Sequence, residues 1–318
     1  MANTYSLKKT SDLSINEKEG LRALFEMVFE KPMSEDEFDR KFSKNPQGNS
    51  YHGLMLCDDE VVGAYSAIPY PYQYFGREMI FALAVDTMIH PQHRGGRTVK
   101  RMAELVYAAL KADDIPFVFG FPNQNIFEYR VKVLNWHHIG DLDYFALPLH
   151  IGAIKPALAW LNPLSKIGAA CFVQLPDLSH GKSSNRQIAK VDDEAFRKHR
   201  YSPDYKRLEL SNGSTCFMRL HSEENGACVA YIIDVSPPTA SAFKQAVKAV
   251  YDYVNNNSDV IMYIGKLDFQ PKGLIKVPVS LQPKAVRFCG KVLLPDMVDE
   301  KILDIDHWQI NLSNYDVR

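Results

Sequence analysis

The chain has few cysteines, and none lies close to another in the sequence. Five cysteines occur among its 318 residues, at positions 57, 171, 216, 228 and 289. Because the number is odd and no CxxC pair occurs, neither a disulfide framework nor a zinc site built on thiolates is favoured. We therefore expect free thiols and no metal site.

A long uninterrupted apolar run is also missing. The most apolar stretch, residues 151–175, is interrupted by two lysines, two prolines and an asparagine, whereas a spanning helix needs about 20 consecutive apolar residues. The N-terminus lacks a charged region followed by an apolar run, so we expect no signal peptide and a cytoplasmic protein. Two roles remain open for residues 151–175: a helical connector packed between two lobes, or a segment that touches a membrane surface.

Neither sign of charge is in excess. The 37 Lys and Arg residues balance 38 Asp and Glu residues, which leaves a formal net charge of −1 at pH 7. Proteins that bind nucleic acid usually present a broad basic surface, so we do not expect nucleic acid as a partner. The length suits one large domain or two ordinary ones.

The most informative stretch is DTMIHPQHRGGRTVK, residues 86–100. It predicts a strand that stops at a proline, a positively charged glycine turn, and the first turn of a helix. The first backbone N–H groups of a helix have no partner inside it and, together with the helix dipole, they bind anions. Arg94 and Arg97 suit a phosphate, and Gly95 and Gly96 allow close approach of the backbone. We predict a site for a pyrophosphate or another phosphorylated cofactor.

Periodicity predicts strands and helices on both sides of this turn. Before it we expect a strand at 5–8, helices at 16–29 and 34–42, a hairpin of strands at 51–57 and 61–69, and a strand at 78–89. After it we expect a helix at 98–112, a strand at 117–121, a helix at 124–134 and a strand at 142–147. This order predicts an α+β fold, with a mixed, mostly antiparallel sheet flanked by helices.

Four landmarks resemble the GNAT superfamily of acyl-CoA-dependent N-acyltransferases. They are Ile89-His90-Pro91, Arg94-Gly95-Gly96-Arg97, Phe121-Pro122-Asn123 and Lys132-Val133-Leu134-Asn135-Trp136, in the family's order. The phrase from Gly120 to Gly140 is similar to two-lobed bacterial members found with surface-polysaccharide biosynthesis and to enhanced-intracellular-survival-like acetyltransferases. The resemblance implies the GNAT fold, acetyl-CoA as cofactor, and transfer of its acyl group to an amine.

The sequence departs from the family's pattern at the turn and at the expected acid. Arg97 stands where the family has Gly, and Val99 where it has Gly or Ala, although backbone amides would still hold the pyrophosphate. With Asn135 in the place of the family's Gly, the position of the usual general-acid Tyr holds Val131. Tyr129 lies two residues earlier, about 200° around the helix.

The resemblance and the chemistry of amide formation give a set of candidate site residues. Those expected to bind the cofactor are Met88, Ile89, Arg94, Gly95, Gly96, Arg97, Thr98, Val99 and Asn123. In the family, a side-chain amide at Asn123 orients either the pantetheine arm or the next helix. Attack of an amine on a thioester needs a proton acceptor and an acid for the thiolate. Asp86 is the candidate base, unless it only bonds a neighbouring strand or caps a bend, and Tyr129 is the candidate acid.

An aromatic cluster lies between two of the expected strands. It consists of Tyr65, Tyr70, Tyr72, Tyr74 and Phe75. Stacking on sugar rings of an acceptor and crowding at a strand edge both explain it.

A second lobe is predicted after a linker at 174–186. Its expected elements are helices at 192–200 and 239–255 and strands at 215–220, 227–235, 260–265, 286–292 and 307–312. It resembles a degenerate GNAT half, in which Pro237 and Pro238 follow the strand where amide donors would lie, so we expect no coenzyme A there. The expected domains are 1–150 for acyl-CoA, 151–186 as apolar connector and linker, and 187–318 as the lobe that shapes the acceptor cleft.

The sequence thus predicts an N-acyltransferase that moves an acetyl group from acetyl-CoA to an amino group of a small molecule. The two-lobed subgroup implies an amino sugar of surface-glycan biosynthesis, nucleotide- or lipid-linked, as the acceptor. Two alternatives remain open. One is a non-catalytic acyl-CoA-binding or glycan-assembly partner, because the usual Tyr is missing. The other is an aminoacyl-tRNA-dependent transferase of the same fold, which the phosphate turn and the near-neutral charge disfavour.

Overall fold

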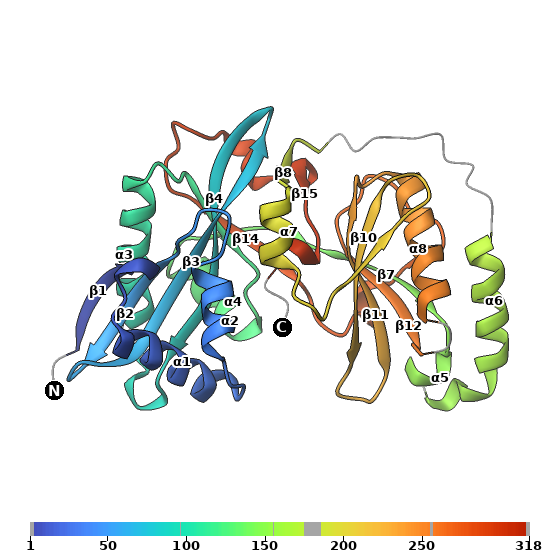
Figure 1. Cartoon of the computed structure of the whole chain (residues 1–318), viewed down its shortest axis with the longest axis horizontal. Coiled ribbons are helices and arrows are strands. Elements are labelled where there is room, and N and C mark those ends of the chain that lie inside the picture. Colours follow the sequence, from blue (N-terminus) through green and yellow to red (C-terminus); the bar gives the residue numbers. More distant parts are fainter. Residues whose placement is uncertain (1–2, 96, 155, 175–185, 255–256, 316–318) are drawn as a thin grey trace. The chain divides into compact units, whose positions relative to one another are not determined.

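The computed structural model describes residues 3–95, 97–154, 156–174, 186–254 and 257–315, which form two compact units (Figure 1). The first unit comprises Met1–Gly140, Gln187–Arg200 and Val286–Ile305, and the second comprises Asp141–Arg186, Tyr201–Ala285 and Asp306–Arg318. The sequence predicted consecutive segments instead, 1–150, 151–186 and 187–318. Segments of the two units alternate along the sequence. This is because strand β7 (Asp143–Pro148) pairs with β12 (Val260–Gly265) in the second unit, and β14 (Arg287–Val292) pairs with β5 (Phe117–Gly120) in the first.

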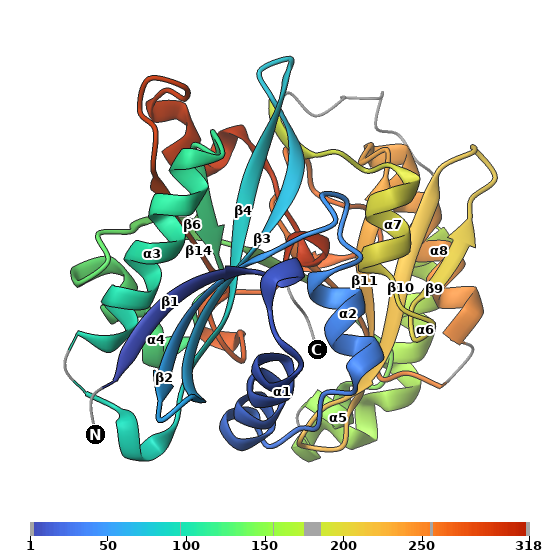
Figure 2. The same ribbon diagram turned by 60° about the vertical axis from the view of Figure 1, so that its left-hand side comes forward.

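The first unit is built on a mostly antiparallel sheet. Its strand order is β1 (Thr4–Lys9), β2 (Tyr51–Cys57), β3 (Glu60–Tyr74), β4 (Arg77–Ile89), β5, β14 and β6 (His137–Asp141), and β8 (Ile188–Lys190) pairs with the outer part of β3. The ladder between β4 and β5 is parallel, whereas β1–β2, β2–β3, β3–β4 and β5–β14 are antiparallel. Figure 2 shows the long β3–β4 hairpin. The predicted α+β fold is confirmed.

Helices cover both faces of this sheet. They are α1 (Ile15–Phe29), α2 (Glu35–Phe42), α3 (Thr98–Ala112), α4 (Gln124–Lys132) and α7 (Glu194–Arg200). Successive residues of a strand point to opposite faces, and on β2 the ring of His52 packs against Phe38 and Phe42 of α2. On the other face, a Cβ at Gly53 would collide with the carbonyl oxygen of Met102 in α3. The glycine thus lets α3 lie directly on the sheet.

The end of α4 and the strand after it differ from the sequence prediction. Asn135 has a φ of 55°, a left-handed conformation that ends the helical segment. The chain then becomes extended and forms β6, a strand that the sequence did not predict. The predicted strand at 286–292 exists as β14, but it belongs to the first unit because it pairs with β5.

The aromatic cluster of β3 belongs to the core. Tyr65, Tyr70, Tyr72 and Tyr74 each expose 6% of their surface or less. The ring of Tyr72 stacks on Phe81, and the hydroxyl of Tyr74 donates to the carboxylate of Asp299 at 2.8 Å. Rings packed in this way have no free face for a sugar, so stacking on an acceptor is wrong for these four tyrosines.

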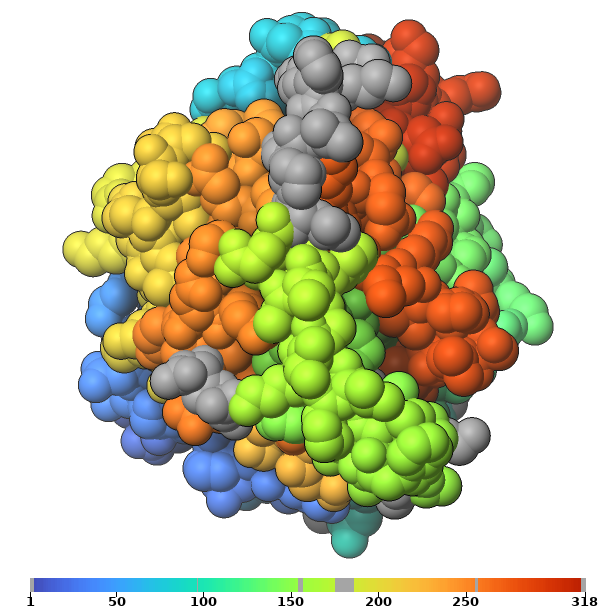
Figure 3. All heavy atoms as spheres, turned by 90° about the vertical axis from the view of Figure 1, so that its right-hand side faces the viewer, coloured from blue at the N-terminus to red at the C-terminus, as the bar shows by residue number. Residues whose placement is uncertain are grey.

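The second unit has a sheet of its own. The strand order is β13 (Ile275–Lys276), β7, β12, β11 (Cys228–Ser236), β10 (Thr215–Ser222) and β9 (Lys206–Glu209). The short strand β15 (Trp308–Gln309) is not part of this sheet. Helix α8 (Ala240–Val254) joins the parallel strands β11 and β12. The predicted connector forms α5 (Ile151–Ile154), a 3-10 segment (Pro156–Leu161) and α6 (Asn162–Gln174), green in Figure 3. Val173 of α6 and Phe243 of α8 share one core cluster with Phe145 of β7.

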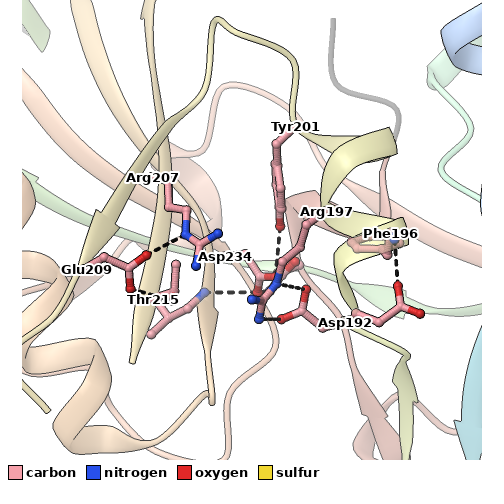
Figure 4. A network of polar contacts seen from close by, with 11 residues as sticks. Asp192, Phe196, Arg197, Tyr201, Arg207, Glu209, Thr215 and Asp234 are labelled. Carbon is pink, nitrogen blue, oxygen red and sulfur yellow. Dashed lines mark hydrogen bonds and ion pairs between the residues drawn. The ribbon is translucent and has the colours of Figure 1, made fainter. Parts of the chain in front are cut away.

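Among the described residues, no helix is both long and apolar enough to cross a membrane. The predicted linker, 174–186, lies outside the described residues from 175 to 185. At the end of β11, where the sequence predicted a degenerate phosphate turn, the side chain of Thr239 accepts a hydrogen bond from the amide of Ala242 and caps α8. The buried carboxylate of Asp234 accepts hydrogen bonds from Tyr201 and Asn311, at 3.0 and 2.8 Å (Figure 4). The end of β11 is thus occupied by side chains of the second unit itself.

Candidate active site

Helix α3 starts directly after the glycine turn, and its N-terminus has no side-chain cap. Strand β4 ends at Ile89, a 3-10 turn (Pro91–His93) follows, and Arg97 is the N-cap residue of α3. Arg97 makes no capping hydrogen bond with its side chain, and no acidic residue lies in the first turn. By contrast, α1 and α2 each begin with a complete capping box. The first turn of α3 therefore offers its amides and the helix dipole to an external anion.

The glycine turn has the backbone form that the sequence predicts. Gly95 has a φ of 138°, which residues with a Cβ rarely adopt, and its carbonyl oxygen accepts a hydrogen bond from the Thr98 hydroxyl at 2.7 Å. The side chains of Arg94 and Arg97 are exposed, whereas Thr98 and Val99 are buried. Gly96 lies outside the described residues. The two arginines can thus reach an anion at the turn, while Thr98 braces it.

Strand β4 has an edge that β5 leaves unpaired. The parallel ladder joins Ala82 to Val118 and Leu83 to Phe119, and it goes no further. Strand β4 continues to Ile89, so residues 84–89, which include Met88, extend past the end of this ladder. An extended ligand with amide groups could pair with such an edge, as another strand would. This edge leads straight into the glycine turn.

Asp86 lies on this stretch at an irregular point of the strand. Its φ is 44°, and the β3–β4 register shifts between Ala64 and Ser66. The side chain is buried, and its carboxylate lies 2.8 Å from the Nζ of Lys41 in α2. Asp86 thus bonds a neighbouring element, one of the two roles expected for it. Its role as a base stays a prediction.

Tyr129 of α4 points its hydroxyl at the first turn of α3. The oxygen is buried and makes no hydrogen bond of ordinary geometry to any described residue. Burial raises the pKa of Tyr129, while the nearby backbone amide of Lys100 and the charge of Arg97 act in the opposite direction. The hydroxyl therefore lies beside the predicted pyrophosphate turn. Whether it is an acid stays a prediction.

Asn123 is the N-cap residue of α4. Its Oδ1 accepts hydrogen bonds from the amides of Asn125 and Ile126, at 3.1 and 3.2 Å. Of the two roles expected from the resemblance, orientation of the next helix is the one that these contacts support. A contact of Asn123 with a cofactor stays a prediction.

Sequence reasoning missed Arg130, the residue after Tyr129. Its side chain is buried, and its guanidinium lies 4.5 Å from the ring centroid of Trp136. The Nη2 group donates a long hydrogen bond, 3.4 Å, to the hydroxyl of Thr87 on β4. The signal in the sequence is faint, because an arginine in a polar helix is usually exposed. Only the glycine at the end of β5, Gly120, marks the space that it fills.

A metal centre is not evident in this region. Among the described residues, no group of three or more His, Cys, Asp or Glu side chains is placed to hold a metal ion. The chemistry available is that of backbone amides, two exposed arginines, a buried ion pair and a buried guanidinium. Such groups bind anions and stabilise developing negative charge.

Comparison with known proteins agrees with this geometry. Residues 9–131 match the family model described as the acetyltransferase (GNAT) domain. No curated protein matches the chain.

Solved structures with the same fold cover most of the chain at low identity. A probable N-acyltransferase from Enterococcus faecalis is 12% identical over 92% of this chain and 73% of its own, with a TM-score of 0.59. Eis1 from Mycobacterium abscessus is 9% identical over 91% of this chain and 74% of its own, with a TM-score of 0.55. Saccharomyces cerevisiae N-myristoyltransferase with bound myristoyl-CoA is 12% identical over 90% of this chain and 79% of its own, with a TM-score of 0.50. The matched segment and the solved structures agree with the sheet and with the uncapped helix after the glycine turn. The chain therefore has the GNAT fold, and its residues 9–131 match the acetyltransferase (GNAT) domain.

Proposed function

We propose that the chain transfers an acetyl group from acetyl-CoA to an amino group of a small molecule. The observation that supports this most is the uncapped first turn of α3 after Gly95, directly beside the unpaired edge of β4. In the proposal, the α3 amides bind the pyrophosphate together with Arg94 and Arg97, and residues 84–89 pair with the pantetheine amides. The yeast N-myristoyltransferase, whose structure contains myristoyl-CoA, shares the fold.

The residues present fit such a donor chemically. Acetyl-CoA supplies a thioester whose carbonyl carbon is open to attack by an uncharged amine. The α3 amides and the two exposed arginines neutralise the negative charge of the diphosphate. Asp86 would accept the amine proton, and its carboxylate is held in place by Lys41, whose Nζ lies 2.8 Å away.

For the acceptor, we propose an amino sugar, nucleotide- or lipid-linked, of surface-glycan biosynthesis. The support is the resemblance of the Gly120–Gly140 phrase to two-lobed polysaccharide-associated proteins. The buried tyrosines of β3 do not supply a sugar platform, so recognition would depend on other groups. We also propose that the second unit, the expected acceptor lobe, binds no coenzyme A, since Thr239 caps α8 and Pro237 and Pro238 lack N–H groups.

Turnover of acetyl-CoA with a panel of amines, monitored by thiol release, tests the function. The panel should contain amino sugars with and without a nucleotide or lipid group, together with amino acids and polyamines. We expect release that depends on an amine and is saturable in acetyl-CoA. Coenzyme A binding without release for every amine would favour the non-catalytic alternative, and the absence of coenzyme A binding would reject the proposal.

Arg94, in the turn, and Arg101, outside it, are both exposed and offer a matched pair of variants. Arg94→Ala should weaken coenzyme A binding by about 1–2 kcal/mol, as loss of one charge-assisted contact. Arg101→Ala removes the same charge from an exposed position of α3, outside the turn, and should have a much smaller effect. Equal losses in the two variants would mean that general electrostatics, and not the turn, hold the diphosphate.

A further inference from the structure

Arg130 is a buried cation that pairs with no counter-charge among the described residues. It exposes 4% of its surface, and no carboxylate pairs with it in the part of the chain that the structure describes. Its Nε and Nη1 have no hydrogen-bond partner among the described residues, which leaves three N–H donors unused. The polar contacts that the structure shows for the charge are the long bond to Thr87 and the face of Trp136.

These contacts do not offset the cost of burial. Moving an ion from water into the protein interior is strongly unfavourable. A desolvated cation–π contact recovers only part of this cost, and a hydrogen bond of 3.4 Å lies beyond the usual range of lengths. An anion placed against the Nε and Nη1 groups would satisfy both the charge and the unused donors. The arrangement is therefore suited to a ligand that brings negative charge.

The guanidinium lies where β4 and β5 separate. A Cβ built on Gly120, the last residue of β5, would be 2.6 Å from Nη1 of Arg130 and 3.1 Å from the carbonyl oxygen of Ala84. Ala84 is the first residue of β4 past the parallel ladder, and Thr87 lies three residues further along the same unpaired stretch. Gly120 thus leaves the space that Arg130 fills, beside the edge assigned above to the pantetheine arm.

We propose that Arg130 is a catalytic residue that binds the donor's thioester and stabilises the negative charge that develops on it. This rests on the proposed function. As the amine nitrogen bonds to the carbonyl carbon, charge builds on the carbonyl oxygen. When the C–S bond breaks, its electron pair leaves on sulfur, and the amine proton passes to the base. A guanidinium keeps its own protons and stabilises both anions by charge and hydrogen bonds.

This assignment accounts for the valine at the position of the usual acid. A thiolate held against a guanidinium leaves as an anion and takes a proton from water after release. The enzyme therefore needs no acid at the position that Val131 occupies. The polar groups around Arg130 do not compete for this role. Burial raises the pKa of both Tyr65 and Tyr107, whose hydroxyls lie 3.1 Å apart, so both are neutral near pH 7. Beside Thr87, Asp86 is paired with Lys41.

The test compares coenzyme A with desulfo-coenzyme A, which lacks only the thiol, and needs no acceptor. Calorimetric affinities are measured between pH 6 and 9 for the wild type, Arg130→Gln, Arg130→Lys and the exposed control Arg101→Gln. If Arg130 favours the thiolate, the pKa of the bound thiol falls below its free value of about 8.5. The affinity ratio of coenzyme A to desulfo-coenzyme A then rises with pH up to that value and levels off above it.

We expect this ratio to rise about tenfold in the wild type and in Arg101→Gln, which corresponds to a thiol pKa lowered by about one unit. Arg130→Gln should keep its affinity for desulfo-coenzyme A, which shows an intact site, and should lose the rise. Arg130→Lys should retain part of it. A wild-type ratio that does not change with pH, or a rise that survives in Arg130→Gln, would overturn the assignment while leaving coenzyme A binding itself established. Failure of both ligands to bind the wild type would instead reject the proposed function.

Discussion

Lys41→Met should destabilise the first unit strongly, because it removes the cation that lies 2.8 Å from the buried carboxylate of Asp86. Side-chain exposure is 13% for Lys41 and 1% for Asp86, so water cannot replace the ammonium freely. Removing one partner of a buried pair typically costs about 3–5 kcal/mol. We expect a loss of about 3 kcal/mol, at the lower end, because Lys41 keeps some contact with solvent.

Asp86→Asn in the Lys41→Met background supplies the control. A neutral amide of the same shape has no unpaired charge, so the double variant should regain about 2 kcal/mol relative to Lys41→Met. The unfolding free energies come from urea denaturation followed by far-UV circular dichroism. A loss below about 1 kcal/mol in Lys41→Met, or additive losses in the double variant, would refute the view that this pair fixes the irregular part of β4.

The remaining predictions address single groups. Tyr129→Phe should lower turnover less than about tenfold and leave stability unchanged, because its hydroxyl makes no hydrogen bond of ordinary geometry within the described chain. A loss of 10²-fold or more with unchanged coenzyme A affinity would make Tyr129 the acid. Gly120→Ala should displace Arg130 and reduce turnover at least tenfold, whereas Gly168→Ala, at a position of α6 where a Cβ meets no atom within 4 Å, should not. Burial lowers the pKa of His52 to about 3, so the neutral form is favoured in the folded chain. The free energy of unfolding should therefore fall as pH drops below about 6.5, and His52→Gln should flatten that decline in urea titrations.

The sequence was sufficient to predict those elements whose local signals agree with their tertiary structure. The strand, glycine turn and helix at 86–112 were predictable because a proline, two glycines and a regular apolar spacing all favour the same boundaries. The helix predicted at 34–42 likewise forms as α2, and Ser34 caps it. Asn135 takes a left-handed conformation, with a φ of 55°, which glycine adopts most readily.

Long-range pairing was not predictable from one sequence. Strand β14 resembles any short apolar strand, and only its pairing with Gly120 and its neighbours assigns it to the first unit. The tyrosines of β3 alternate as a half-exposed strand would, yet Phe81 and Asp299 cover them. Arg130 was missed for the same reason, since burial of a charge depends on elements distant in the sequence.

Titration of the wild-type chain with coenzyme A, beside the variant Gly95→Pro, tests the central claim most directly. Proline at residue 95 removes an amide and requires a φ near −65°, whereas Gly95 has a φ of 138°. The account predicts one coenzyme A per chain for the wild type, and severe loss of binding for a Gly95→Pro protein whose circular dichroism shows that it is folded. Two molecules per chain, or unchanged affinity in the folded variant, would contradict it.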